Sequence, residues 1–193
     1  MKIGLFFGSF NPIHVGHLII ANYMVENTDL DEIWMVITPH NPHKKRRHLA
    51  ADYDRLDLVN MAVENHSKLR ASDVEFDLPK PSYTIETLTY LNEEYPQHNF
   101  ILIMGGDNLA TLPKWKNYEQ ILVHYGIYVY KRPAYELGNL AAHPKVVLFD
   151  APLMTISSSL IRKMIKEGKS IRYWVTEKVL EGIESKGMYQ VRE

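Results

Sequence analysis

Hydrophobic residues gather along the chain in short continuous runs, separated by segments in which apolar residues recur at helical spacing. Five runs have the length of a strand, and none of them alternates strictly between apolar and polar positions. Continuous runs are typical of strands buried on both faces, as in a mainly parallel sheet covered by helices. The predicted strands are residues 2–7, 33–38, 99–104, 126–130 and 145–149.

Helical spacing is clearest in residues 54–64 and 85–94, and another apolar-periodic segment begins at Leu18. The helix over 85–94 is expected to stop at Pro96, because proline cannot continue the helical hydrogen bonds. Strands that alternate with helices predict a doubly wound α/β fold. The segments 39–48 and 131–144 are predicted to be loops.

The C-terminal part, about 152–193, has a different character. Ser157 is a good helix N-cap ahead of an apolar-periodic segment, and Gly168 is expected to end that helix. A second amphipathic helix is predicted over 176–187, closed by Gly187. We therefore expect one domain over residues 1–193 that carries a small helical C-terminal appendage.

Composition narrows the class of protein. Hydrophobic residues make up 46% and charged residues 23% of the 193 positions, which is ordinary for a globular protein. The net charge of −1 gives no sign of a nucleic-acid binder, and the absence of cysteine excludes disulfides and thiolate catalysis. No apolar stretch approaches the ~18 residues of a membrane span, and no secretory leader is evident, so a cytoplasmic location is expected.

Candidate chemistry is concentrated in the turn after the first predicted strand, Gly8-Ser-Phe-Asn-Pro-Ile-His-Val-Gly-His17, which we call the opening turn. Open α/β sheets bind ligands at the carboxyl ends of their strands. Gly8, Ser9 and Gly16 permit close approach of backbone N–H groups to an anion, and a helix N-terminus favours negative charge. His14 and His17 add ring donors, so the turn predicts a phosphate site. The alternative is that both histidines only cap or pack.

A zinc site is a further interpretation of these histidines. His14 and His17 have ligand-like spacing, and so have His40 and His43. Four consecutive cations follow His43 directly, and no acidic residue lies near either pair in the sequence. Because both features disfavour a bound dication, we predict no protein-bound metal.

The four cations, Lys44-Lys-Arg-Arg47, follow the second predicted strand. They fit a solvated loop, a nucleic-acid patch or a clamp for a polyphosphate. Because parallel strands end at the same edge of a sheet, the run is expected beside the opening turn. Lys44 and Lys45 are then the expected phosphate contacts, since they follow the rigid segment 39–42.

A second anion site is predicted at the start of the helix after the last core strand. Ser157, Ser158 and Ser159 supply hydroxyls there, and Arg162 supplies a guanidinium on the first turns of the helix. Helix capping alone is the alternative for the serines. Two anion sites at one edge of a sheet suit a triphosphate better than a single phosphate ester.

Another candidate segment follows the third predicted strand. Gly105 and Gly106 permit close approach of the backbone, and Asp107 is suited to accept hydrogen bonds from ribose hydroxyls. Trp115 offers a flat face to an aromatic ring, with packing in the core as the alternative.

These segments together resemble a known family. The opening turn is similar to the His-x-Gly-His signature of the nucleotidyltransferase superfamily, and the chain resembles its bacterial nicotinate mononucleotide adenylyltransferases. The resemblance runs nearly end to end. Pro81-Ser-Tyr-Thr84 and the stretch from Asp107 to Leu-Pro-Lys-Trp115 single out this branch. The other matching segments are 41–44, 131–133, 156–162 and 187–189.

The resemblance implies a Rossmann-like nucleotidyltransferase fold and a defined reaction. The phosphate of nicotinate mononucleotide attacks the α-phosphorus of ATP directly, giving deamido-NAD and pyrophosphate, with Mg²⁺ carried on the ATP phosphates. His17 would donate to the oxygens that gain charge in the transition state. The implied catalytic residues are His14, His17, Lys44 and Arg162. The implied ATP-binding residues are Gly8, Ser9, Phe10, His14, His17, Gly105, Asp107, Ile156, Ser157, Ser158 and Arg162. Thr84, Trp115 and Lys44 are implied to bind the mononucleotide.

Other functions stay open at this point. One is adenylyl transfer to another phosphate monoester, such as nicotinamide mononucleotide or phosphopantetheine. A distant one is a nucleic-acid-binding, synthetase-like module, which the two histidines and residues 44–47 suggest. The chain lacks a Lys-Met-Ser-Lys-Ser type loop and an RNA-binding extension, so the expected partners are ATP and the mononucleotide, without nucleic acid or membrane. A homo-oligomer is compatible with the sequence.

Overall fold

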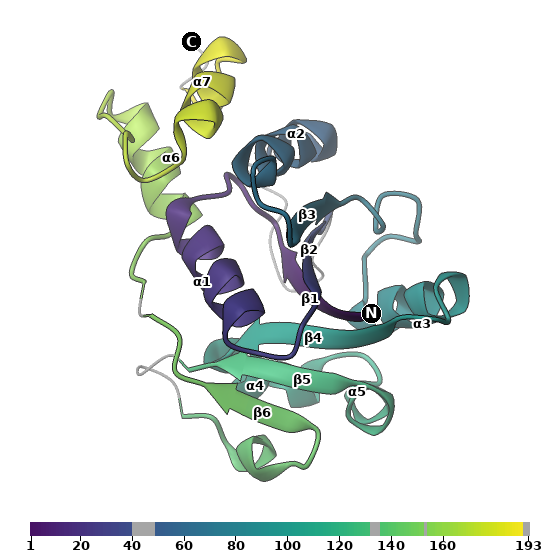
Figure 1. Ribbon diagram of the computed structural model, residues 1–193. Coiled ribbons are helices and arrows are strands. Elements are labelled where there is room, and N and C mark those ends of the chain that lie inside the picture. Colours follow the sequence, from purple (N-terminus) through teal and green to yellow (C-terminus); the bar gives the residue numbers. More distant parts are fainter. Residues whose placement is uncertain (40–48, 132–135, 153, 191–193) are drawn as a thin grey trace.

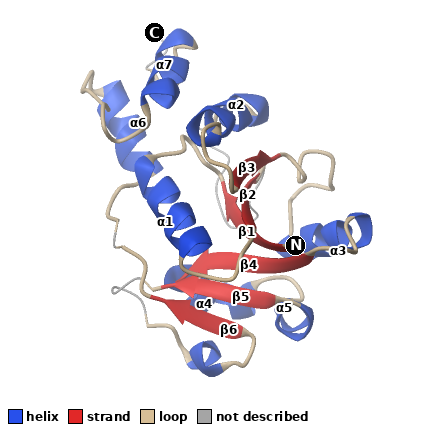
Figure 2. Cartoon of the chain, viewed as in Figure 1, coloured by secondary structure: helices blue, strands red, loops and turns tan. Residues whose placement is uncertain are grey.

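A computed structural model describes residues 1–39, 49–131, 136–152 and 154–190. Within them one sheet contains six parallel strands in the order β3-β2-β1-β4-β5-β6, with helices on both faces (Figures 1 and 2). The order in which the strands are added to the sheet reverses between β1 and β4, which is the topological switch point of a doubly wound fold. The strands are β1 (Lys2–Gly8), β2 (Glu32–Ile37), β3 (Leu69–Ser72), β4 (Asn99–Gly105), β5 (Gly126–Tyr130) and β6 (Val146–Phe149).

The helices divide between the two faces of the sheet. Helices α1 (Val15–Glu26), α2 (Asp52–Val63), α6 (Ser158–Lys166) and α7 (Glu177–Ser185) contribute to one core cluster, and α3 (Thr84–Glu94), α4 (Gly106–Thr111) and α5 (Tyr118–His124) to the other (Figure 1). The short 3-10 helices are η1 (Leu112–Lys114) and η2 (Asn139–Ala142). No helix of the described segments is long and apolar enough to cross a membrane.

The central strands β1, β2, β4 and β5 are buried on both faces, as their continuous apolar runs predict, whereas the edge strand β6 leaves Val147 exposed. Met35 and Ile103 belong to the core cluster beneath α1 and α2, whereas their neighbours Val36 and Leu102 belong to the cluster beneath α3 and α4. All four residues are at most 2% exposed. Because successive strand residues point to opposite faces, only a sheet covered on both sides buries such a run completely.

The predicted doubly wound, mainly parallel fold is therefore confirmed, with differences in detail. The first helix begins at Val15 rather than at Leu18, with His14 as its N-cap, and α2 begins at Asp52 rather than at residue 54. Strand β3 was not predicted, because it has only four residues and two of them, Arg70 and Ser72, are polar. The predicted loop 131–144 contains the short helix η2.

The two predicted C-terminal helices are present with the expected ends. The Ser157 hydroxyl accepts a hydrogen bond from the backbone N–H of Leu160 at 3.2 Å, which caps α6, and Thr176 caps α7 in the same way. Gly168 and Gly187 follow the two helices with φ values of 66° and 57°, a left-handed conformation that glycine adopts without strain. Apolar residues of both helices join the core cluster that contains α1 and α2.

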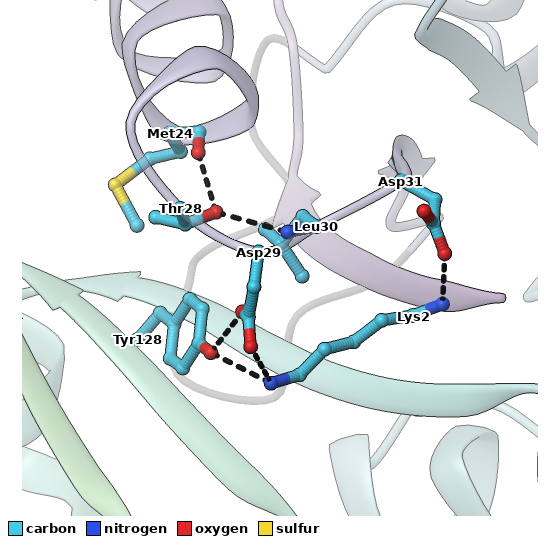
Figure 3. Close-up of polar contacts among 7 residues, drawn as sticks. All are labelled: Lys2, Met24, Thr28, Asp29, Leu30, Asp31 and Tyr128. Atoms are coloured by element: carbon cyan, nitrogen blue, oxygen red, sulfur yellow. Dashed lines mark hydrogen bonds and ion pairs between the residues drawn. The ribbon is translucent and has the colours of Figure 1, made fainter.

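A polar network connects strands near their amino ends, away from the carboxyl ends of the strands. The ammonium of Lys2 at the start of β1 donates to Asp29 at 2.6 Å and to the Tyr128 hydroxyl at 2.9 Å, and Tyr128 donates to Asp29 at 2.5 Å (Figure 3). Asp31 accepts from the backbone N–H of Lys2 at 2.6 Å. The network joins β1, β5 and the connection between α1 and β2. The candidate chemistry lies at the other end of the strands, at their carboxyl ends.

Candidate active site

The opening turn leaves β1 at the switch point and is folded tightly over its own aromatic residue. The Phe10 ring lies beneath Gly8, so that a Cβ atom on Gly8 would come within 2.7–3.0 Å of it. Phe10 is 2% exposed, has a φ of 42° and packs edge-on against Phe6 and His17. Only its backbone, and not its side chain, is therefore available for the predicted contact with ATP. Gly8 is required because no side chain fits between the turn and this ring.

Three backbone carbonyls of the opening turn are bound by side chains from distant parts of the chain. Arg55 of α2 donates to the Ser9 carbonyl at 2.5 Å, and Arg162 of α6 donates to the Asn11 carbonyl at 2.6 Å. The Ser158 hydroxyl donates to the Pro12 carbonyl at 2.9 Å. The contacts of Ser158 and Arg162 hold the N-terminal part of α6 directly against the turn, as the predicted second anion site requires.

Arg55 is a fully buried arginine that sequence analysis did not select. Besides Ser9 it donates to the Thr38 carbonyl at 3.0 Å, to the Ala50 carbonyl at 3.2 Å and to the Asp52 carboxylate at 2.7 Å. Burial lowers the pKa of Arg55, and the neighbouring Asp52 opposes that shift. A guanidinium has five donors in a fixed plane, so it joins the turn, the end of β2 and the start of α2 at once.

The two histidines of the opening turn lie face to face. Their ring centroids are 3.7 Å apart with an interplanar angle of 20°, and His14 is 5% exposed while His17 is half-buried. The backbone N–H of His14 donates to Nδ1 of His17 at 3.3 Å. Because Nδ1 accepts this hydrogen bond, the proton of a neutral His17 ring lies on Nε2. His17 therefore presents an N–H donor on the side of the ring away from the backbone.

The predicted residues after β4 lie across the switch point from the turn. A Cβ atom on Gly105 would collide with the Asp107 carboxylate and come within 3.1 Å of the Tyr130 ring, so glycine is needed here for packing against these two side chains, and the predicted approach to a ligand stays a prediction. Asp107 lies in the first turn of α4. On the other side of the sheet, Ile156 packs partly buried against the core cluster that contains Phe10 and α1.

A pocket opens on the other side of β1, and it contains both residues predicted to receive the nicotinate. Thr84 begins α3, and half-buried Trp115 follows η1. Gly8 and Ser9 reach this pocket from the opening turn, whereas the two histidines and Arg162 do not line it. Its other polar or aromatic lining residues include Thr38, Glu75, Ser82, Tyr83, Asn108 and Lys116. We call it the mononucleotide pocket.

Lys116 places a positive charge at the pocket, and sequence analysis did not select it. Its ammonium lies 2.6 Å from the Glu86 carboxylate and 4.5 Å from the centre of the Tyr83 ring. The hydrogen bond to Glu86 raises the pKa of Lys116, so the residue is cationic at neutral pH. The sequence feature that could have identified Lys116 as a pocket residue is its position directly after Trp115.

Some predicted residues lie outside the described part of the chain. They are Lys44, Lys45 and the histidines at 40 and 43, so the structure tests neither the phosphate clamp nor the four-histidine zinc interpretation. Within the described residues, no group of three or more His, Cys, Asp or Glu side chains is arranged to hold a metal ion.

Comparison with known proteins identifies the class. The model of the cytidylyltransferase-like family matches residues 5–164, and the chain belongs to this family of nucleotidyltransferases. It belongs more narrowly with proteins named probable nicotinate-nucleotide adenylyltransferase. The one from Cytophaga hutchinsonii is 57% identical over 98% of both chains, and the one from Flavobacterium johnsoniae is 56% identical over 98% of this chain and all of that one.

A solved structure supports the fold. The Plasmodium falciparum nicotinic acid mononucleotide adenylyltransferase, solved in complex with NaAD, superimposes with a TM-score of 0.82 over 97% of both chains, at 22% sequence identity. The resemblance stated from the motifs is thus confirmed at the level of family and fold.

Proposed function

We propose that this protein catalyses adenylyl transfer from ATP to nicotinate mononucleotide, which yields deamido-NAD and pyrophosphate in NAD biosynthesis. The observation that carries the proposal is the convergence of two unlike sites on the carboxyl ends of β1 and β4. A turn with two stacked histidines and the adjoining Arg162 lies on one side, and a pocket with Trp115 and Thr84 lies on the other. A triphosphate suits the first site and an aromatic ring suits the second.

The ATP half of the reaction belongs to the opening turn. The Nε2–H group of His17 would donate a hydrogen bond to the α-phosphate oxygens as they gain negative charge, and His14 would contact the same phosphates. Arg162, already held against the turn, and Lys44 would bind the β- and γ-phosphates and favour departure of pyrophosphate. No covalent intermediate is needed, because positioning and charge stabilisation supply most of the catalysis of such transfers.

The mononucleotide half belongs to the pocket. Trp115 would stack on the nicotinate ring, and Thr84 would hydrogen-bond its carboxylate region. Lys116 at the same pocket is paired with Glu86, and an anionic carboxylate would share this ammonium with Glu86, an interaction that a neutral carboxamide lacks. This arrangement supports nicotinate mononucleotide over its nicotinamide counterpart.

Mg²⁺ would be carried on the ATP phosphates, where it neutralises charge, rather than by ligands of the protein. A cytoplasmic location and a homo-oligomeric state stay predictions, as do the roles of Gly105, Asp107, Ile156 and Ser157 in lining the ATP site.

The test is a substrate panel in one pyrophosphate-release assay. ATP with Mg²⁺ is incubated with nicotinate mononucleotide, nicotinamide mononucleotide or phosphopantetheine in turn. We expect the highest kcat/KM with nicotinate mononucleotide. Phosphopantetheine as the best substrate, or no pyrophosphate with any of the three, would contradict the proposal.

A further inference from the structure

Glu75 is a buried acid in the wall of the mononucleotide pocket. It follows β3 by three residues, is 1% exposed and lines the same pocket as Trp115. A carboxyl group this deeply buried is rare unless a cation or a hydrogen-bonding network compensates for the lost water. The groups that act on it are three hydroxyls, those of Thr87, Thr38 and Ser82.

These hydroxyls belong to three segments that meet at the pocket. Thr38 follows β2, Ser82 precedes α3, and Thr87 lies one turn into α3. The Thr87 hydroxyl donates to Oε1 of Glu75 at 2.7 Å. This hydrogen bond ties Glu75 to the first turn of α3, the turn that begins with Thr84.

Two buried atoms next to this hydrogen bond are left without a partner. They are Oε2 of Glu75 and Oγ of Ser82, for which the described residues provide no hydrogen bond. The Ser82 hydroxyl is close enough to influence Glu75, yet the two groups do not complete a bond. Buried polar atoms are nearly always paired with protein, water or ligand. Both residues line the pocket, so a polar group of its occupant, directly or through a water molecule, is what would complete the pair.

The same surroundings shift the pKa of Glu75. Burial raises the pKa of Glu75, and the three hydroxyls oppose this shift to a smaller extent. Among the residues that the structure describes, no cation acts on it. A neutral carboxyl group tolerates an anionic ligand nearby, whereas an ionised one repels it.

We propose that Glu75 is a positioning residue of the mononucleotide pocket. It holds the segment 82–84 against the end of β2 through Thr87 and, with the Ser82 hydroxyl, forms a polar floor for an aromatic ring that carries a hydrogen-bonding substituent. The inference rests on the proposed function, because it takes the nicotinate ring as that ligand.

Three variants test this role in steady-state assays of pyrophosphate release, with each substrate varied in turn. Glu75→Leu removes the hydrogen bonds, and the KM for nicotinate mononucleotide is expected to rise about tenfold while kcat and the KM for ATP change little. Glu75→Gln is neutral and still forms hydrogen bonds, so its KM stays close to that of the wild type. Thr89→Val is the matched control, because Thr89 lies on the exposed side of the same helix, where its hydroxyl donates to the Ile85 carbonyl, and it does not line the pocket.

The outcomes separate the possibilities. An unchanged KM in Glu75→Leu, or a parallel change of kcat and both KM values, overturns the positioning role. A strong increase in the preference of Glu75→Gln for nicotinate over nicotinamide mononucleotide overturns the inference, because it means that the wild-type acid repels the carboxylate instead of positioning the ring. If Glu75→Leu does not fold, Thr87→Val removes only the donor to Oε1 and carries the same expectation. A wild-type protein that releases no pyrophosphate contradicts the proposed function itself, whereas an active wild type with an unaffected Glu75→Leu contradicts this inference alone.

Discussion

The opening turn and the mononucleotide pocket lie at the carboxyl ends of the same strands, yet their polar groups are arranged in opposite ways. In the turn, the carbonyls of Ser9, Asn11 and Pro12 are each bound by a side chain from a distant helix. In the pocket, Glu75 and Ser82 each keep a buried polar atom unpaired within the described chain. The backbone of the turn is held in place by the protein itself, whereas the pocket is completed by what enters it.

The difference fits the two tasks that we propose for these regions. A phosphate site acts on the transition state best when its donors are fixed before the substrate arrives, because no reorganisation is then required during the reaction. A recognition pocket gains selectivity from buried polar groups that only the correct ligand satisfies, because an analogue without the matching group leaves them unpaired. Substitutions in the two regions should therefore affect different quantities.

The largest effect is expected at Arg55, which supports the turn. Arg55→Met removes the arginine donor from the carbonyl of Ser9 and from the buried carbonyl of Thr38, and leaves Asp52 with only the longer contact to Lys80 at 3.7 Å among its described ion pairs. We expect the free energy of unfolding to fall by about 3–5 kcal/mol, measured by urea denaturation followed by circular dichroism. Arg55→Lys should recover only part of it, since an ammonium cannot reach separated acceptors in one plane. A loss as small as that of an exposed ion pair would show that the turn is held by other contacts.

At the turn itself, His17→Ala should reduce kcat rather than affinity. Loss of a donor that acts on charge developed in the transition state costs ~10²–10³-fold in kcat, and the KM for nicotinate mononucleotide should stay nearly constant. Steady-state pyrophosphate release measures both. His66→Ala, a substitution on the far side of α1 that touches Asn22, serves as the control. A change confined to the KM for the mononucleotide would contradict this prediction, because it would mean that His17 acts in the mononucleotide pocket.

In the pocket, Trp115→Ala should show the reverse pattern. The loss of stacking is expected to raise the KM for nicotinate mononucleotide about tenfold, with little change in kcat or in the KM for ATP. Trp115→Phe keeps an aromatic face and should retain most of the affinity. Equal effects of Trp115→Ala on both substrates would mean that the two regions are not separate binding sites.

The smallest effect concerns stability and pH at Glu75. Since burial raises the pKa of this acid in the folded state, the folded protein binds its proton more tightly than the unfolded chain does. The stability that the neutral form contributes is fully present below the ordinary value of 4.5 and is lost as the pH rises through the folded pKa. Glu75→Gln should therefore gain stability relative to the wild type from pH 4.5 upward, as compared in urea titrations at several pH values. A difference that does not vary with pH would indicate that the acid is not perturbed.

The sequence revealed the parts of the site that depend on local pattern. The small residues and histidines of the opening turn and the cap at Ser157 follow strand ends or begin helices, where spacing predicts their position. The roles of Thr84 and Trp115 were expected from the family resemblance instead. Strand β3 escaped prediction because four residues with two polar ones carry too little periodicity.

The residues that the sequence did not reveal act through long-range contacts. Arg55 stands three positions after Asp52, which is also the spacing of an ordinary surface ion pair on a helix, and only the fold buries it against Ser9 and Thr38. Glu75 lies in a connection without hydrophobic periodicity, and its burial depends on how three separate segments meet. Such positions are set by tertiary packing, which a single sequence does not display.

The central claim is that the two regions together transfer an adenylyl group. Its most direct test is a pair of parallel reactions of the wild-type protein with Mg²⁺ and nicotinate mononucleotide, one with ATP labelled at the α-phosphorus and one with ATP labelled at the γ-phosphorus. The account predicts that the α label appears in deamido-NAD and the γ label in pyrophosphate. Transfer of the γ label to the mononucleotide, or recovery of both labels in unreacted ATP, would contradict it.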